Sequence, residues 1–225
     1  ILAGNILWAI ADISLGRLLD KGVGLKKTLR IMQLLNRAHM EMIEGQYLDI
    51  SFEGRSDVTL PNYMDMISKK TGAFMRSALA VGALIGSGDA SIVRAFKECG
   101  RSLGLVFQIR DDVLGIWGDE SITGKPVGSD IRQKKNSLPL LYAMSQTNGA
   151  DKELMSNVYR DRVLNDAAVA SIMDILEKVN AKEYSERLAS KHRVKAIEAL
   201  SKVNMTTRVI EEMDEVAMFL QFREH

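Results

Sequence analysis

Two adjacent carboxylates, Asp111 and Asp112, stand near the end of a largely apolar segment that is predicted to be helical. With Gln108 and Gly115 they fall at positions i, i+3, i+4 and i+7, which places all four on one helix face. Adjacent carboxylates repel each other, and the C-terminal end of a helix favours cations. A divalent cation such as Mg²⁺, which commonly joins carboxylates to substrate phosphates, would neutralise this charge. A solvated acidic helix end, or an ion pair with a nearby arginine, is the alternative interpretation.

A basic, glycine-containing loop follows the acidic pair, with the sequence TGKPVGSD at residues 123–130. Glycines allow a backbone to approach an anion closely, and lysines bind phosphate as point charges. Lys125 lies in this loop, and Lys135 follows it. The spacing is not that of a P-loop, because Gly124-Lys125 is not followed by Ser or Thr. The loop therefore predicts an anion site, with a basic surface loop as the alternative.

Two further polar groups lie earlier in the chain, on segments predicted to be helical. Lys70 and Thr71 precede Gly72, whose position inside a helix costs roughly 1 kcal/mol relative to Ala. A local break there would turn Lys70 and Thr71 inward, whereas a solvated lysine is the simpler interpretation. Gln46 and Asp49 share a face near the end of another helix, where an ordinary helix terminus is the alternative. If these helices pack together, the carboxylates, lysines and amides form a site for Mg²⁺ and a diphosphate.

Other kinds of chemistry have less support in this sequence. The three histidines are scattered, and their spacing with the single cysteine, Cys99, does not suggest a zinc site. The Gly-x-Ser-x-Gly string at residues 100–104 lies inside a predicted helix and not at a strand-to-helix turn, so no nucleophile elbow is expected, and no Cys/His pairing is present. The formal net charge of +1 gives no reason to expect nucleic acid as a partner.

The elements that must position these residues are predicted to be helices only. The 225 residues are 46% hydrophobic and contain three prolines, which leaves long stretches free for helices. No segment shows sustained β-alternation between hairpin turns. We expect one all-α domain spanning residues 1–225, with a loop at 118–129. Helices are predicted at 1–19, 25–48, 59–85, 90–117, 137–147, 150–160, 166–202 and 205–222.

The location of the protein is also constrained by the sequence. No apolar run of about 18 residues occurs, so no integral membrane segment is expected. Cys99 cannot form an internal disulfide and is predicted to be a small buried residue in a reducing compartment. We therefore expect a cytoplasmic protein.

Five motifs, taken together and in order, resemble the trans-isoprenyl diphosphate synthases, also called polyprenyl synthetases. They are Gly45-Gln46-x-x-Asp49, Lys70-Thr71-Gly72, Phe107-Gln108-x-x-Asp111-Asp112, Gly124-Lys125-x-x-Gly128-x-Asp130 and Lys135-x-Ser137-Leu138-Pro139. The resemblance covers nearly the whole chain. It implies an isoprenoid-synthase-type helical bundle around a central cavity, and a reaction that condenses an allylic diphosphate with isopentenyl diphosphate.

The resemblance also implies a role for each motif residue. Asp111 would ligate Mg²⁺, with Asp112 supporting it through water or hydrogen bonds. Gln46 and Asp49 would be polar residues on the cavity side. The expected catalytic residues are Lys70, Thr71, Gln108 and Lys125. The expected diphosphate-binding residues are Lys70, Gln108, Lys125 and Lys135.

The chain departs from the family pattern in two places. The last position of the second Asp-rich motif is Gly115 instead of Asp, and Asp119 lies one turn further on. The N-terminal helices, the first Asp-rich motif and the isopentenyl diphosphate site would lie before residue 1, so this chain alone would be incomplete. Of up to three Mg²⁺ ions, two would depend mainly on that upstream motif. The family also implies a homodimer. A regulatory, non-catalytic subunit, or a relative that cyclises or couples a prenyl diphosphate, is the alternative.

Overall fold

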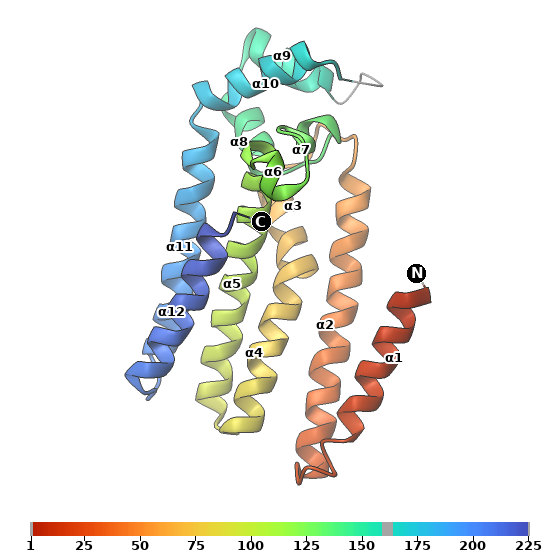
Figure 1. Ribbon diagram of the computed structural model, residues 1–225, viewed down its shortest axis with the longest axis vertical. Coiled ribbons are helices and arrows are strands. Elements are labelled where there is room, and N and C mark those ends of the chain that lie inside the picture. Colours follow the sequence, from red (N-terminus) through yellow and green to blue (C-terminus); the bar gives the residue numbers. More distant parts are fainter. Residues whose placement is uncertain (1, 159–163, 225) are drawn as a thin grey trace.

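The computed structural model describes residues 2–158 and 164–224, and these residues form helices joined by short connections (Figure 1). The long helices α2 (Leu25–Phe52), α4 (Ala73–Gly86), α5 (Ala90–Trp117) and α11 (Ala181–Ser201) run side by side, with α5 packed between α4 and α11. No strand occurs in the described part of the chain. The all-α prediction is confirmed.

The predicted helix starts are confirmed where a side chain can cap them. Thr59 accepts a hydrogen bond from the backbone N–H of Asn62, and the Asn62 side chain in turn accepts from the backbone of Thr59, so the two form a capping box. Asp89 accepts from two backbone N–H groups at the start of α5. These contacts are local in sequence, which is why the sequence predicts them well.

The helix predicted for residues 59–85 is divided at its lysine-containing segment. It consists of α3 (Leu60–Ile67), a π-helical turn η1 (Ser68–Gly72) and α4. A π-helical turn holds one extra residue and shifts the direction of the side chains beside it. The local break expected at Gly72 is therefore present, and Lys70 and Thr71 lie within it.

The helix predicted for residues 166–202 is wrong as a single element. It forms α10 (Asp166–Lys178) and α11, separated at Val179 and Asn180. Asn180 has a φ of 53°, in the left-handed region that Asn tolerates better than most residues. The change of direction lets α10 cross the end of the bundle while α11 runs along α5 (Figure 1).

Smaller differences concern the ends of the other elements. The predicted loop at 118–129 contains α6 (Glu120–Thr123) and leads into α7 (Ser129–Arg132). The helices predicted at 137–147 and 150–160 are α8 (Leu138–Gln146) and α9 (Gly149–Val158). α2 extends four residues beyond its predicted end, to Phe52. Residues 159 and 160 of the predicted 150–160 helix lie outside the described residues. The remaining helices are α1 (Leu2–Gly16) and α12 (Thr207–Phe222).

The core lies mainly along α5, which contributes buried residues from Ala95 to Ile116. Cys99 is 0% exposed, as the sequence predicted, and burial raises its pKa to about 12, so this thiol is unreactive. Over its described residues, α1 has no buried residue, and it packs mainly on α2 (Figure 1). Among the described residues, no helix is both long and apolar enough to cross a membrane.

A half-buried histidine gives the free energy of unfolding a predictable dependence on pH. His192 on α11 is half-buried, and burial together with Lys191, Lys195 and Arg101 lowers its pKa from about 6.5 to about 4. Between these values only the unfolded chain binds the proton, so the free energy of unfolding should rise as pH rises from 4 to 6.5. We expect this contribution to be about 1–3 kcal/mol.

Substitution H192Q isolates this contribution. The pH dependence of the wild-type free energy of unfolding should exceed that of H192Q between pH 4 and 6.5, as measured by urea unfolding at several pH values. Parallel pH curves for the two proteins would contradict the assignment.

Candidate active site

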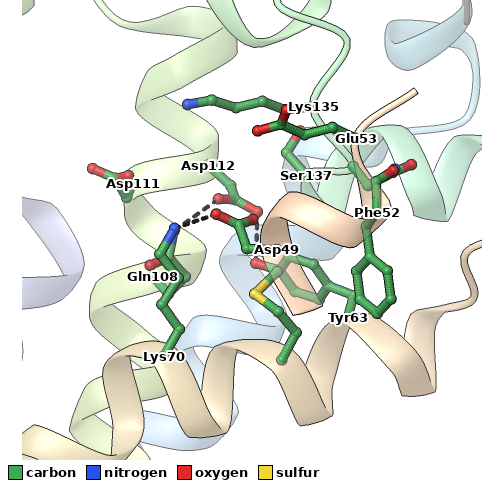
Figure 2. Close-up of a pocket in the computed structure, with 12 residues that line it drawn as sticks. Asp49, Phe52, Glu53, Tyr63, Lys70, Gln108, Asp111, Asp112, Lys135 and Ser137 are labelled. Atoms are coloured by element: carbon green, nitrogen blue, oxygen red, sulfur yellow. Dashed lines mark hydrogen bonds and ion pairs between the residues drawn. The ribbon is translucent and has the colours of Figure 1, made fainter. Parts of the chain in front are cut away.

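A cavity of about 220 Å³ opens where α2, α3, η1 and α5 meet the segment before α8 (Figure 2). Most of the predicted polar residues that the five motifs contributed face this one space, although they lie as far apart in sequence as Asp49 and Lys135. Its lining residues are Asp49, Phe52, Glu53, Tyr63, Met66, Lys70, Gln108, Asp111, Asp112, Lys135, Asn136 and Ser137.

Asp112 is a buried carboxylate whose oxygens are occupied by protein donors. Its Oδ2 accepts from the Tyr63 hydroxyl at 2.6 Å and from the backbone N–H of Leu138 at 2.7 Å. Its Oδ1 accepts from the Gln108 amide at 3.1 Å. Burial raises the Asp112 pKa to about 7, although the three hydrogen bonds oppose the shift. Asp112 thus ties α3 and the start of α8 to α5.

Asp111, the neighbouring carboxylate, has a different environment. Its side chain is 49% exposed, whereas Asp112 is 6% exposed. Figure 2 shows the two carboxylates on different sides of α5. Asp111 forms an ion pair with Arg223, whose terminal nitrogen lies 3.3 Å from its Oδ1. Asp111 is therefore the member of the pair that is open to a ligand.

Replacing Asp112 by Asn tests its structural role. The amide nitrogen would face a donor, either the Leu138 N–H or Gln108, and one buried hydrogen bond would be lost. We expect D112N to lower the free energy of unfolding by about 2–4 kcal/mol, measured by chemical denaturation. Unchanged stability would show that these hydrogen bonds do not hold the three elements together.

Lys70 reaches the cavity from the π-helical turn and forms an ion pair with Asp49 of α2 (Figure 2). The turn can lie this close to α2 because residue 45 is glycine. A Cβ added at Gly45 would lie 2.6 Å from the Lys70 Cα. Gly104 similarly allows α5 to approach Gly72, whose Cα would lie 2.6 Å from an added Cβ. Close packing at glycines thus sets the position of Lys70.

Thr71 and Gln108, which were both expected to be catalytic residues, contact each other directly. The Thr71 hydroxyl donates to Gln108 Oε1 at 2.8 Å, while the Gln108 amide nitrogen donates to Asp112. Gln108 lines the cavity, and Thr71 orients it from the adjacent turn. This chain of hydrogen bonds fixes the amide orientation of Gln108.

Gly115, at the position where a third Asp is usual in the motif, faces Asp130. A Cβ at residue 115 would lie 2.5 Å from the Asp130 carboxyl carbon. Asp130 is buried and forms an ion pair with Lys135 at 3.2 Å. Burial raises the Asp130 pKa, whereas Lys135 opposes that shift. Burial lowers the Lys135 pKa, but Asp130 together with Asp111 and Asp112 raises it overall. The Asp130 carboxylate therefore occupies the space that a side chain at 115 would need.

Three predicted residues, Gln46, Thr71 and Lys125, do not line the 220 Å³ cavity, and neither does the candidate substitute Asp119. Gln46 is half-buried on α2 but is not one of the lining residues. Lys125 lines a neighbouring cavity of about 110 Å³ that also includes Asp111 and Arg223. Asp119 caps α6 by accepting from the Ser121 N–H, which gives it a structural role away from the acidic pair.

Three residues at the site were not expected from the sequence. Tyr63, Asp130 and Arg223 each contact a motif carboxylate or lysine. Tyr63 is 49 positions from its partner Asp112, and Arg223 is 112 positions from Asp111, so no local pattern connects them. Asp130 belongs to the glycine-containing loop motif. Its position five residues before Lys135 was the sequence signal from which their ion pair could have been predicted.

The donor set suits Mg²⁺ better than a metal that needs a full protein cage. Within the described residues, no group of three or more His, Cys, Asp or Glu side chains could hold a metal ion. Mg²⁺ keeps several waters and is usually bound by one or two carboxylates together with substrate phosphates. The open Asp111 carboxylate, with Lys70 and Lys135 facing the same cavity, fits that mode of binding.

Comparison with known proteins gives consistent matches along the chain. A family model described as polyprenyl synthetase matches residues 1–176. A short chain isoprenyl diphosphate synthase from Methanothermobacter thermautotrophicus is 35% identical over 231 residues, covering 100% of this chain and 67% of the relative.

Solved structures show the same similarity. A polyprenyl synthetase from Streptomyces coelicolor is 34% identical with a TM-score of 0.87, covering 98% of this chain and 65% of that one. A geranylgeranyl pyrophosphate synthase from Corynebacterium glutamicum, complexed with isoprenyl diphosphate and magnesium, is 27% identical with a TM-score of 0.85, covering 99% and 62%. The chain thus spans between 62% and 67% of the length of these three proteins.

Proposed function

The chain belongs to the polyprenyl synthetase family, and from this premise we propose that the complete protein is a Mg²⁺-dependent prenyltransferase. It condenses an allylic diphosphate with isopentenyl diphosphate to give a longer trans-prenyl diphosphate. The observation that carries the proposal is the 220 Å³ cavity, where Lys70, Lys135 and the open carboxylate of Asp111 face one space.

The lysines stabilise the charge that develops when the allylic diphosphate ionises. The bond between the allylic carbon and the diphosphate oxygen breaks, and the oxygen keeps the electron pair. Cations that are already in place lower this barrier, because they need no reorganisation during the step. Lys70 is held by Asp49 and Lys135 by Asp130, so both ammonium groups are positioned before substrate binds. Lys125, in the neighbouring cavity beside Asp111, would bind the same diphosphate.

The remaining lining residues protect and orient the organic part of the reaction. The double bond of isopentenyl diphosphate attacks the allylic cation and leaves a new carbocation. The released diphosphate then takes a proton from this cation, and the electron pair of the broken C–H bond forms the double bond of the product. Phe52 and Met66 line the cavity with apolar groups, which exclude water from the cation. Gln108, oriented by Thr71, presents a fixed amide dipole beside the ionising bond.

Magnesium would be held at Asp111, and it supplies Lewis-acid stabilisation of the departing diphosphate when bound. Asp112 supports Asp111 by fixing the end of α5, since its own oxygens are occupied by hydrogen bonds. Of up to three Mg²⁺ ions, two would depend mainly on the first Asp-rich motif of the family, which this chain does not include. The corynebacterial structure with magnesium supports a divalent cation in this family.

Three wider predictions belong to the same proposal. Residues 1–225 would be the later part of one larger domain, in line with their coverage of the relatives. Two copies would form a homodimer, which the exposed apolar residues of α1, such as Ile6 and Ile13, support. The protein would act in the cytoplasm, where highly charged diphosphate substrates are available.

The test is incubation of the complete protein with Mg²⁺, isopentenyl diphosphate and an allylic diphosphate, followed by mass spectrometry. Longer linear diphosphates, absent when Mg²⁺ is chelated, are expected. A hydrocarbon or alcohol as the sole product would instead identify a cyclising or coupling relative. No turnover until a second, catalytic subunit is added would identify a regulatory subunit.

A further inference from the structure

The chain end beyond α12 is fixed to the helix that carries the acidic pair. The backbone carbonyl of Arg223 accepts a hydrogen bond from Arg110 Nε at 2.8 Å. The two residues are 113 positions apart in sequence, so this contact anchors the C-terminal segment to α5. The Arg223 side chain is consequently held beside the end of α5, where Asp111 lies.

The guanidinium group of Arg223 has two further contacts on α5. Its Cζ lies 4.2 Å from the centroid of the Phe107 ring, a distance at which the cation is attracted to the ring face. Its terminal nitrogen lies 3.3 Å from Asp111 Oδ1. Phe107 and Asp111 are one turn apart on the same helix, so a single guanidinium group reaches both.

Burial makes this pairing unlike an ordinary surface ion pair. The Arg223 side chain is only 10% exposed, whereas Asp111 is 49% exposed. A buried guanidinium group depends on its acceptors, because water reaches it poorly. Asp111, by contrast, remains accessible to a cation from solvent.

We propose that Arg223 is a built-in counter-ion for Asp111 that a divalent cation must displace. The inference rests on the proposed function in one respect, the assignment of Asp111 as a metal ligand. A metal ion bound to Oδ1 and the guanidinium group on the same oxygen compete for one acceptor and repel each other. Arg223 is therefore a positioning residue, which weakens the binding of metal alone.

The neighbouring 110 Å³ cavity shows where the displaced side chain can go. Arg223, Lys125 and Asp111 all line it, together with Gly115 and other residues. Gly115 lies against the Asp130 carboxylate and adds no side chain to this cavity. Two cations facing one cavity favour an anion, so a diphosphate that arrives with the metal replaces Asp111 as the partner of Arg223.

The experiment measures binding of Mn²⁺ to the complete protein by electron paramagnetic resonance, without substrate. Only the Mn²⁺ ions that bind the wild type but not D111N are counted, because these ions depend on Asp111. R223M keeps the length and the apolar contact with Phe107 but removes the charge, and it should tighten Mn²⁺ binding by about three- to tenfold. In the D111N background, R223M should leave Mn²⁺ binding unchanged.

A second variant tests whether the position of the Arg223 guanidinium group, and not only its positive charge, weakens Mn²⁺ binding. F107L retains every charge but removes the ring that supports Arg223, so it should also tighten Mn²⁺ binding, by about two- to threefold. Thermal unfolding checks that R223M and F107L remain folded. Unchanged or weaker Mn²⁺ binding in folded R223M, or unchanged binding in folded F107L, would overturn the inference.

These readouts do not depend on turnover. Failure of the prenyl-transfer assay with the expected Mn²⁺ results would overturn the proposed reaction and leave the counter-ion in place. If prenyl transfer is observed but R223M does not change Mn²⁺ binding, the proposed role of Arg223 would be rejected and the proposed reaction would stand.

Discussion

Replacing Asp111 by Asn should lower turnover of the complete protein by roughly 10²–10³-fold while lowering the free energy of unfolding much less than D112N does. Asp111 is the carboxylate that faces the cavity and remains half-exposed. In the proposed mechanism its charge holds the Mg²⁺ that offsets the negative charge on the departing diphosphate, so the loss should appear in the chemical step. The measurement is single-turnover product formation at saturating Mg²⁺, together with chemical denaturation.

Two neighbouring carboxylates serve as controls for this prediction. D112N should reduce stability, because Asp112 accepts three buried hydrogen bonds. D119N should leave turnover and stability unchanged, since Asn caps a helix as well as Asp does and Asp119 caps α6. Turnover in D111N equal to that of the wild type would remove Asp111 from the metal site. A large loss in D119N would show that this residue compensates for Gly115.

Replacing Gly45 by Ala should displace Lys70 and reduce both activity and stability. The new methyl group would lie 2.6 Å from the Lys70 Cα, and that atom belongs to the backbone of the π-helical turn. Overpacking of this kind typically costs about 1–3 kcal/mol. A shift of the turn by about 1 Å should lower turnover by roughly 10²-fold, since Lys70 contacts the reacting diphosphate in the proposed mechanism.

Gly82 provides the matched control, because it also lies inside a helix but has nothing within 4 Å of an added Cβ. G82A should be neutral or should stabilise the protein by up to about 1 kcal/mol, as expected for Ala replacing Gly in a helix. Both variants are compared by chemical denaturation and turnover. Equal behaviour of G45A and G82A would show that close packing at Gly45 does not position Lys70.

The sequence predicted most of the helices because the signals that define them are local. The capping box at Thr59 and the cap at Asp89 each join residues two or three positions apart. The division between α10 and α11 was missed, since Asn180 in the left-handed region has no strong local signal. Short helices such as α6 were missed for a related reason, because four residues show no periodicity.

The sequence by itself determined which functional groups the site contains. These are two carboxylates on one helix and lysines on other segments, in the motif order of the family. Only the tertiary structure decided that Asp112 is the buried, hydrogen-bonded carboxylate and that Asp111 is the one open to a ligand. Neighbouring residues on a helix point about 100° apart, so Asp112 reaches the cavity as a buried carboxylate, whereas Asp111 lines it half-exposed. Packing of α3 and of the start of α8 buries Asp112, and the chain end brings Arg223 to Asp111. Contacts between residues 26 to 112 positions apart leave no local pattern, because they depend on how whole helices pack.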